Sequence, residues 1–128
     1  MEDRELLRLA AQAARSAYAP YSNFPVGAAL LGEEGTVFTG CNVENASYGL
    51  TLCAERVALG KAVAAGVRRF QALALWAPAA VWPCGACLQC LAEFAPRLRI
   101  IRGGNNLEME VKSLVELFPA AFRLPAPE

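Results

Sequence analysis

The chain has 128 residues, 12 basic and 12 acidic side chains, no histidine and five cysteines. This length predicts a single domain over residues 1–128, with a core that needs no disulfides. A formal net charge of zero argues against a nucleic-acid partner, because affinity for a phosphate backbone comes largely from Lys and Arg. Only 19% of residues are charged, against about 25% in an average domain, so apolar surface is expected at subunit contacts of a homo-oligomer.

The sequence shows neither a secretory signal nor a membrane-spanning stretch. Residues 1–8 mix charged residues with leucine, and the apolar run over residues 72–88 is interrupted by Pro78, Pro83 and Gly85. A membrane helix needs about 20 mostly apolar residues. We therefore expect a cytoplasmic protein without membrane contacts, whose cysteines stay reduced and serve metal binding or catalysis.

Predicted helices and strands alternate along the chain. The spacing of apolar residues predicts a first helix that is capped by Asp3 and runs to Ala17. Strands over residues 26–31 and 36–40 are expected to form a hairpin across a glycine-containing turn. The later elements are predicted, in chain order, as a helix over residues 52–65, a strand over 70–76, a helix over 85–94, a strand over 97–102, a weaker strand over 107–111 and a short helix over 113–118. This order predicts an α/β fold, a mixed β-sheet of about five strands covered by helices.

Three cysteines lie at the starts of two predicted helices. Cys84 and Cys87 form a CxxC motif, where the helix dipole and free backbone N–H groups favour thiolates. Cys53 starts the other helix, and Glu55 follows two residues later. If the two helix starts face each other, three thiolates fill three positions of a tetrahedral zinc and leave the fourth for water, as catalytic zinc requires.

Two other readings of these residues stay open on the spacing alone. Cys90 or Cys41 could supply a fourth ligand and close the site, which would make it a structural zinc module. A CxxC motif is also typical of thiol redox proteins, which need no zinc. Glu55 would then be an ordinary glutamate in a first helical turn, favoured there by the dipole.

Four motifs in a fixed order carry a family resemblance. They are Phe24–Ala28 (FPVGA), Gly40–Tyr48 (GCNVENASY), Cys53–Arg56 (CAER) and Pro83–Cys87 (PCGAC). Together they resemble the short, homotetrameric cytidine deaminases, the members of the nucleoside deaminase family that hold zinc with three cysteines. The resemblance extends from the first helix to residues 117–119. It implies a cytidine deaminase-like fold.

The resemblance also implies a reaction. Cys53, Cys84 and Cys87 would hold one Zn²⁺ per chain, and Glu55 would be the catalytic proton carrier. Cytidine, and also deoxycytidine, would be hydrolysed to the uridine product and ammonia. A polynucleotide substrate is disfavoured because the sequence has no basic, aromatic-rich strand channel.

Further residues receive roles from the resemblance alone. Those implied in nucleoside binding are Phe24, Asn42, Glu44 and Ala54; those through which neighbouring subunits complete the pocket are Ala46, Tyr48 and Phe122; and Arg56 would hydrogen-bond the zinc thiolates. Without the resemblance, Asn42 and Glu44 would be read as turn residues, Phe24 and Phe122 as core aromatics, and Arg56 as a solvated helix residue.

The sequence departs from the family pattern at two positions. Leu88 stands where arginine is usual, and Trp82 stands where a small polar residue is more common. Neither position is an implied ligand or proton carrier. Because of these two departures, another cytosine nucleoside, such as an aminoacylated nucleoside antibiotic, stays open as an alternative substrate.

Overall fold

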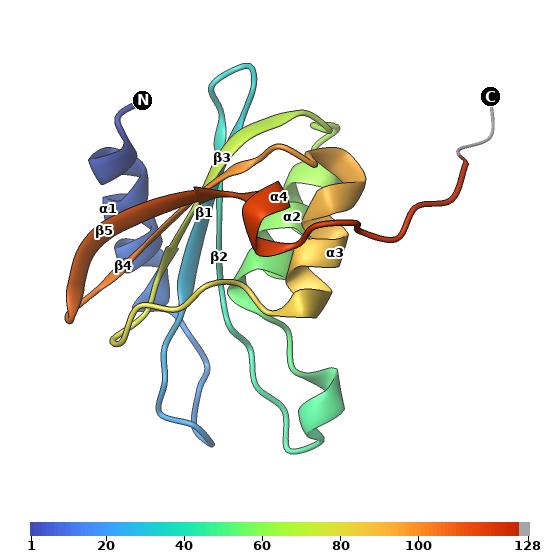
Figure 1. Ribbon diagram of the computed structural model, residues 1–128. Helices are drawn as coiled ribbons and strands as arrows, with labels where there is room; N and C mark the ends of the chain where they lie inside the picture. Colours follow the sequence, from blue (N-terminus) through green and yellow to red (C-terminus); the bar gives the residue numbers. More distant parts are fainter. Residues whose placement is uncertain (126–128) are drawn as a thin grey trace.

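Five strands form one mixed sheet with helices on both faces in the computed structural model, which describes residues 1–125 (Figure 1). In chain order the elements are α1 (Asp3–Ala14), β1 (Gly27–Gly32), β2 (Val37–Cys41), the 3-10 turn η1 (Tyr48–Leu50), α2 (Ala54–Ala64), β3 (Phe70–Trp76), α3 (Gly85–Phe94), β4 (Arg99–Gly104), β5 (Leu107–Ser113) and α4 (Leu114–Leu117). The strand order is β2-β1-β3-β4-β5. Only the β3–β4 pair is parallel within the described sheet, and the predicted mixed sheet is confirmed.

Alternate residues of β1 face two separate cores. Ala28 and Leu30 belong to the larger core, which α2, α3 and α4 cover. Ala29 and Leu31 belong to the smaller core beneath α1. All six residues of β1 are buried, so this strand reads as a continuous apolar run rather than an alternating one.

Two glycines let helices pack directly on the strands. A Cβ atom on Gly27 would lie 1.9 Å from the backbone oxygen of Ala10 in α1. A Cβ atom on Gly40 would lie 2.4 Å from the backbone oxygen of Ala54 in α2. The missing side chains therefore set how closely each helix approaches the sheet.

Two helix boundaries differ from the prediction because extended backbone pairs replace helical turns. Tyr18 pairs with Val43, so α1 ends at Ala14 instead of Ala17. Val43 also pairs with Leu52, so α2 begins after Cys53 rather than at residue 52. These pairs tie together the loops before β1 and before α2, which lie side by side at one end of the molecule (Figure 1).

Asp3 does not cap α1 as predicted. The N-cap is Glu2, which makes no side-chain cap bond. The carboxylate of Asp3 accepts two hydrogen bonds from Arg99 of β4, at 3.1 and 2.6 Å. Asp3 therefore ties the first turn of α1 to the sheet instead of to its own helix.

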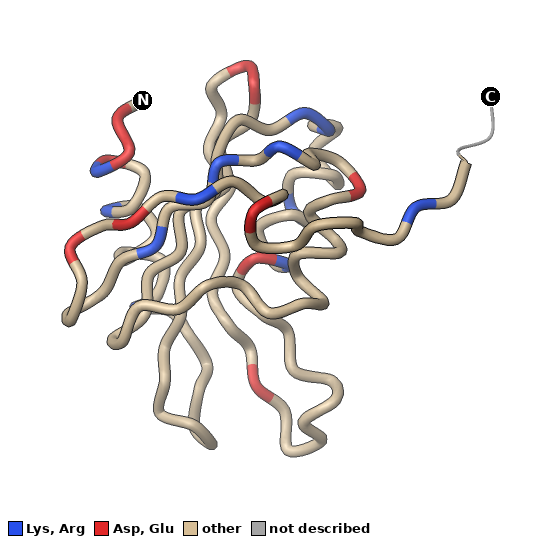
Figure 2. Tube along the Cα trace, viewed as in Figure 1, with Lys and Arg blue, Asp and Glu red and all other residues tan. Residues whose placement is uncertain are grey.

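Charged residues are scarce at the end of the molecule where the loops before β1 and α2 lie. Residues 16–26 carry no charge, and residues 42–53 carry only Glu44. Figure 2 shows most Lys, Arg, Asp and Glu residues away from this end. Among residues 1–125, no helix combines the length and apolarity that crossing a bilayer requires.

Candidate active site

The starts of α2 and α3 bring three cysteines together. Cys53 is the N-cap of α2, Cys84 is the N-cap of α3, and Cys87 follows in the first turn of α3. Their sulfur atoms all lie within 4.8 Å of one another. The positive ends of two helix dipoles therefore point at one cluster of thiols, which favours thiolates there.

The geometry and the donor atoms of this cluster fit zinc. Three sulfurs at about 2.3 Å from one tetrahedral ion lie roughly 3.8 Å apart, which agrees with the observed spacing. Neither Cys41 nor Cys90 joins the cluster in the described residues. Cys90 instead packs partly buried against the larger core. Three cysteines leave one tetrahedral position open, and they fit one zinc ion per chain.

Hydrogen bonds favour a thiolate at Cys53. A bond with Cys87 and a weaker one from Arg56 lower the pKa of the Cys53 thiol to about 5. The same bond with Cys53, together with burial, raises the pKa of Cys87. Hydrogen bonding thus favours the thiolate form of Cys53, and a bound dication would offset the charge of further thiolates.

Arg56 lies against the cluster from the side of α2. Its Nη2 atom is 3.7 Å from the sulfur of Cys53 and 3.5 Å from the carbonyl oxygen of Thr51. Its Nε atom is buried and has no hydrogen-bond partner among the described residues. Arg56 is therefore held against the cysteine cluster and is not fully solvated.

Glu55 is buried beside the cysteines, with 4% of its surface exposed. Burial raises the pKa of its carboxyl group to about 7, since the charged form loses solvation. It shares a cavity of about 220 Å³ with Cys53 and Cys84. The cavity therefore brings a carboxyl group suited to proton transfer near neutral pH next to a zinc-binding cluster.

Most of the cavity wall is apolar, and part of it was not singled out from the sequence. The lining residues are Val26, Asn42, Thr51, Cys53, Ala54, Glu55, Leu75, Val81, Trp82 and Cys84. Asn42 and Ala54 were predicted to line a nucleoside pocket, whereas Leu75, Val81 and Trp82 were not. These three come from β3 and the loop after it, and only the position of that loop next to Cys84 could have suggested them.

Asn42 and Glu44 both hold the loop that precedes β1. The Asn42 Oδ1 atom accepts from the Val26 N–H at 2.9 Å, and its Nδ2 atom donates to the Phe24 carbonyl at 3.0 Å. Glu44 accepts from the N–H groups of Tyr21 and Ser22, at 3.0 and 3.1 Å. A hydrogen bond from the Ser22 hydroxyl, followed by these two, lowers the pKa of Glu44.

The predicted nucleoside residues therefore fall into two groups. Asn42 and Ala54 line the cavity, but in the described chain Phe24 and Glu44 lie outside its lining. Phe24 is half-buried, and Glu44 is buried. Glu44 fixes the loop that Phe24 belongs to.

The residues implied in contacts between subunits face away from their own core. Ala46 is exposed, Tyr48 is 68% exposed and Phe122 is 67% exposed. Tyr48 stacks edge to face on Tyr21, with ring centroids 6.1 Å apart. Gln89 of α3 binds the backbone of Phe122 through both amide atoms, at 2.9 and 3.3 Å. The tail is thus held on α3 while the phenyl ring projects outward.

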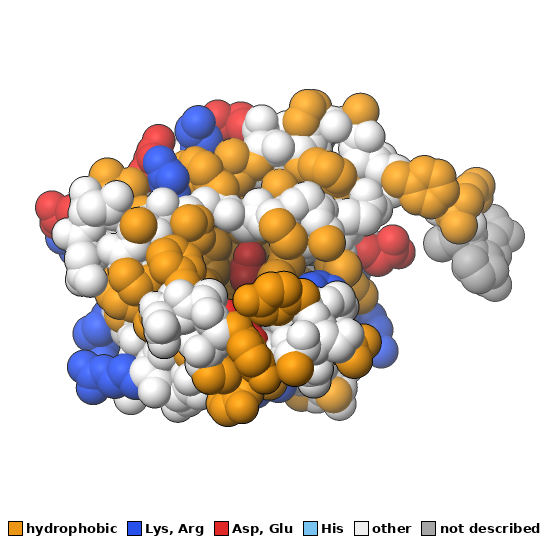
Figure 3. Space-filling view, turned by 90° about the horizontal axis from the view of Figure 1, so that it is seen from below, with side chains coloured by type: hydrophobic (Ala, Val, Ile, Leu, Met, Phe, Trp, Pro, Cys, Tyr) orange, Lys and Arg blue, Asp and Glu red, His pale blue; other side chains and the backbone are white. Residues whose placement is uncertain are grey.

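Seen from the charge-poor end, hydrophobic side chains surround a hollow with acidic atoms inside it (Figure 3). The exposed large hydrophobic residues of the loops here are Tyr18, Tyr21, Val43, Tyr48, Leu50 and Leu52. This is the end of the molecule at which the loops before β1 and α2 meet. A single chain leaves this apolar rim uncovered.

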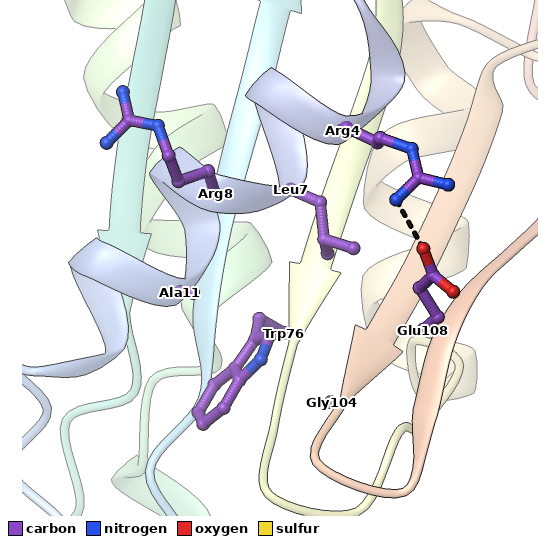
Figure 4. Close-up of a pocket in the computed structure, with 7 residues that line it drawn as sticks. All are labelled: Arg4, Leu7, Arg8, Ala11, Trp76, Gly104 and Glu108. Carbon is purple, nitrogen blue, oxygen red and sulfur yellow. Dashed lines mark hydrogen bonds and ion pairs between the residues drawn. The ribbon is translucent and has the colours of Figure 1, made fainter.

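A second cavity, of about 240 Å³, lies on the opposite face of the sheet beside α1 (Figure 4). Leu7 and Trp76 form its apolar part. Arg4 is paired with Glu108 across it, and Arg8 is paired with a glutamate of its own helix. No metal-ligating cluster of described residues lies there.

The fold and the site together define a class of protein. A mixed sheet whose helix starts bring three cysteines and a buried glutamate into one cavity is typical of the zinc-dependent deaminases of nucleosides and nucleobases. The family model described as "Cytidine and deoxycytidylate deaminase zinc-binding region" matches residues 1–102. The chain belongs to this family.

Relatives along almost the whole chain agree with this assignment. Cytidine deaminase from Sporosarcina psychrophila is 46% identical over 125 residues, covering 95% of this chain and 92% of its own. Cytidine deaminase from Halalkalibacterium halodurans is also 46% identical over 125 residues, covering 95% of each chain. The crystal structure of cytidine deaminase from Burkholderia pseudomallei superposes with a TM-score of 0.92 at 47% identity, covering 95% of this chain and 100% of that chain. The predicted fold and family are confirmed.

Proposed function

We propose that this chain is a zinc-dependent cytidine deaminase, which hydrolyses cytidine and deoxycytidine to uridine or deoxyuridine and ammonia. One observation carries the proposal: Cys53, Cys84 and Cys87 form an open three-cysteine cluster in the same cavity as the buried Glu55. The similarity to cytidine deaminases along 95% of the chain supports cytidine as the substrate.

The chemistry divides between the metal and the carboxyl group. When held by Cys53, Cys84 and Cys87, a zinc ion would supply a water of lowered pKa. Glu55 would accept a proton from the attacking water as the water oxygen bonds to C4 of the pyrimidine, and would deliver that proton to ring N3. Glu55 would then take the second proton, from the hydroxyl group newly formed on C4, and pass it to the amino group, so that the C4–N bond breaks, C4 becomes a carbonyl carbon and ammonia leaves.

Arg56 acts on this chemistry through the sulfur atoms. Three thiolates and one dication leave a net charge of −1, and the guanidinium of Arg56 lies 3.7 Å from the Cys53 sulfur. A hydrogen bond to a ligand sulfur draws charge away from the metal and so supports a low pKa of the bound water.

Asn42 and Glu44, with Phe24 and Ala54, are proposed to bind the nucleoside. Both polar side chains already fix the loop at residues 21–26, so they can present acceptor and donor atoms to sugar hydroxyls without further ordering. A site built to bind a hydroxyl rejects an analogue that lacks it by about 10⁴-fold or more. Free cytosine is therefore expected to have a far lower kcat/KM than cytidine. Comparable values for the two would remove Asn42 and Glu44 from the proposed site.

A homotetramer is proposed to complete the pocket. The apolar rim of Figure 3 is uncovered in one chain. Ala46 and Tyr48 are exposed in the loop before α2, and Phe122 is exposed in the C-terminal tail. Large exposed apolar patches usually mark interfaces. Neighbouring subunits would place these residues at one another's cavities, which in a single chain lack an outer wall.

One measurement on the purified protein separates this proposal from its rivals. Zinc per chain and the loss of cytidine absorbance are followed together. An open catalytic site gives one zinc and turnover, a structural zinc module gives zinc without turnover, and a thiol redox protein gives neither. Turnover of another cytosine nucleoside, but not of cytidine, would keep the chemistry and change the substrate.

A further inference from the structure

We infer that Trp82 is a specificity-determining residue, whose ring forms the cavity wall beside Cys84 and limits what the cytosine ring can carry at C5. Arg102 is a positioning residue that holds this ring in place. The inference rests on the proposed function and deepens it, because it names the part of the substrate class that the cavity excludes.

Trp82 lies in the loop between β3 and α3, two residues before the zinc-cluster residue Cys84. It is half-buried and lines the same cavity as Glu55. This cavity measures about 220 Å³, below the about 300–1,000 Å³ of most ligand pockets. The part of the pocket that one chain forms is therefore small, and a substituent that points at Trp82 must displace part of the wall.

The chemistry of cytosine indicates which edge of the base meets Trp82. The atoms O2 and N3 and the amino group form a polar edge, whereas C5 and C6 form an edge without hydrogen-bonding groups. In the proposed reaction Glu55 transfers protons to N3 and to the amino group. The apolar wall made by Leu75, Val81 and Trp82 is complementary to the C5–C6 edge. Trp82 is the largest side chain of that wall, so it is the main limit on substituents there.

Two cations on β4 and β5 fix the orientation of the tryptophan ring. The Arg102 Cζ atom lies 4.5 Å from the ring centroid, and the Lys112 Nζ atom lies 5.7 Å from it. Both are within the about 6 Å at which cations attract an aromatic face. Arg102 is itself held, because Nε and Nη2 donate to Glu110 at 2.9 and 2.6 Å. The ring therefore cannot turn away from the cavity without losing these contacts.

The backbone that carries Trp82 is fixed to the same hairpin. Arg102 Nη1 lies 3.4 Å from the Ala80 carbonyl, and the Ala80 N–H donates to Asn106 Oδ1 at 2.8 Å. The Asn105 N–H donates to the Pro78 carbonyl at 3.0 Å. Within residues 1–125, no residue of β4 or β5 lines the cavity itself. The hairpin thus reaches the site through this loop and its tryptophan, and also through the pairing of β4 with β3, in which Arg102 lies opposite the cavity residue Leu75.

The first test compares kcat/KM for 5-methylcytidine and for cytidine in the zinc-loaded enzyme. One extra carbon in a tight apolar pocket changes kcat/KM by about 10–200-fold. Trp82→Ser is expected to raise the ratio of 5-methylcytidine to cytidine by about tenfold or more, and Trp82→Phe by less. An unchanged ratio in a Trp82→Ser protein that retains its zinc would overturn the inference.

The role of Arg102 is tested on the same ratio with a matched control. Arg102→Met keeps Trp82 but removes its stacking cation, and is expected to shift the ratio in the same direction by about threefold to tenfold. Arg99→Met removes an arginine ion pair from the same strand, where the partner is Asp3, and should leave the ratio at the parent value. Equal ratios in both variants would overturn the positioning role.

A spectroscopic measurement tests the contact without turnover. The chain has two tryptophans, and Trp76 lies beneath α1 on the other face of the sheet (Figure 4). In Trp76→Phe, titration with the product uridine is expected to change the fluorescence of Trp82, whereas Trp82→Phe should show no response. If Trp82 fluorescence does not respond to uridine in an enzyme that deaminates cytidine, this inference is contradicted but the proposed function is not. A zinc-loaded parent that does not deaminate cytidine contradicts the proposed function and the inference with it.

Discussion

Glu55 and Cys53 lie two positions apart at the start of α2. Substitution of the proposed proton carrier and substitution of a zinc ligand should nevertheless have different effects on turnover and zinc content. Glu55→Gln keeps the size of a buried side chain but cannot accept a proton, so deamination should fall by at least about 10²–10⁴-fold. Zinc per chain should stay at the parent value, and the free energy of unfolding should stay within about 0.5 kcal/mol. Turnover, zinc content and thermal midpoint are measured on the same sample.

The control for this variant is Glu93→Gln, which changes an exposed glutamate of α3 and should leave turnover unaltered. A Glu55→Gln protein that keeps its zinc and still deaminates within about tenfold of the parent would show that another group moves the proton.

Cys90 provides a separate test of the open coordination position. It lies one helical turn beyond Cys87 and packs on the core, outside the cysteine cluster. Cys90→Ser is therefore expected to keep one zinc per chain and most of the activity, whereas Cys87→Ser should lose both. Metal analysis of the two variants side by side measures this difference in zinc content. Zinc loss from Cys90→Ser would favour the closed structural site.

At the scale of the element, the approach of α2 to β2 sets the position of the Cys53 end of the site. A Cβ atom on Gly40 would lie 2.4 Å from the Ala54 oxygen, so Gly40→Ala should push the start of α2 outward. Overpacking of this kind costs about 1–3 kcal/mol of folding free energy. We expect lower zinc affinity in a chelator competition as well as a lower thermal midpoint.

Gly27→Ala is the matched variant, because its Cβ atom would collide with Ala10 of α1 instead. Since α1 carries no zinc ligand, this variant should lose stability to a similar extent but keep the zinc affinity of the parent. Equal loss of zinc affinity in both variants would show that general destabilisation, and not the position of α2, controls the metal.

Elements with a local signal were predictable from the sequence. β3 was predicted over its observed residues, Phe70–Trp76, from an apolar run, and α3 over Gly85–Phe94 from the proline before it. The cysteine cluster followed from spacing at two helix starts. The end of α1 was wrong because the pairing of Tyr18 with Val43 joins residues far apart in sequence and leaves no local pattern.

The wall of the cavity was not predictable for the same reason. Trp82 was noted only as a departure from the family pattern, because its position depends on Arg102 and on the β4–β5 hairpin. Leu88, the other departure, is buried in the larger core, where leucine packs against apolar neighbours. The roles of Asn42 and Glu44 in holding the loop before β1 also required three-dimensional contacts.

At the scale of the whole molecule, the apolar rim should control assembly. Leu50 is 68% exposed in η1, within the charge-poor loops. Leu50→Asp places a charge in the proposed interface, so sedimentation should show species smaller than the proposed tetramer, and cytidine turnover should fall. Zinc per chain should remain at one, because the three cysteines come from a single chain.

Thr36→Asp adds the same charge in the β1–β2 turn, away from the rim, and serves as the control for Leu50→Asp. It should sediment and turn over cytidine as the parent does. A parent protein that sediments as a fully active monomer would contradict both the tetramer and the shared pocket.

The position of β3 has a consequence for how the chain folds. Cys53 precedes this strand and Cys84 follows it, while β3 itself pairs with β1 on one side and β4 on the other. Bringing such distant residues together costs loop-closure entropy, which only the completed strand pairs repay. A chain in which β3 has not yet paired with β1 and β4 contains the three cysteines but lacks the site that they form. The amount of zinc bound per chain therefore reports the fraction of chains in which the sheet is complete.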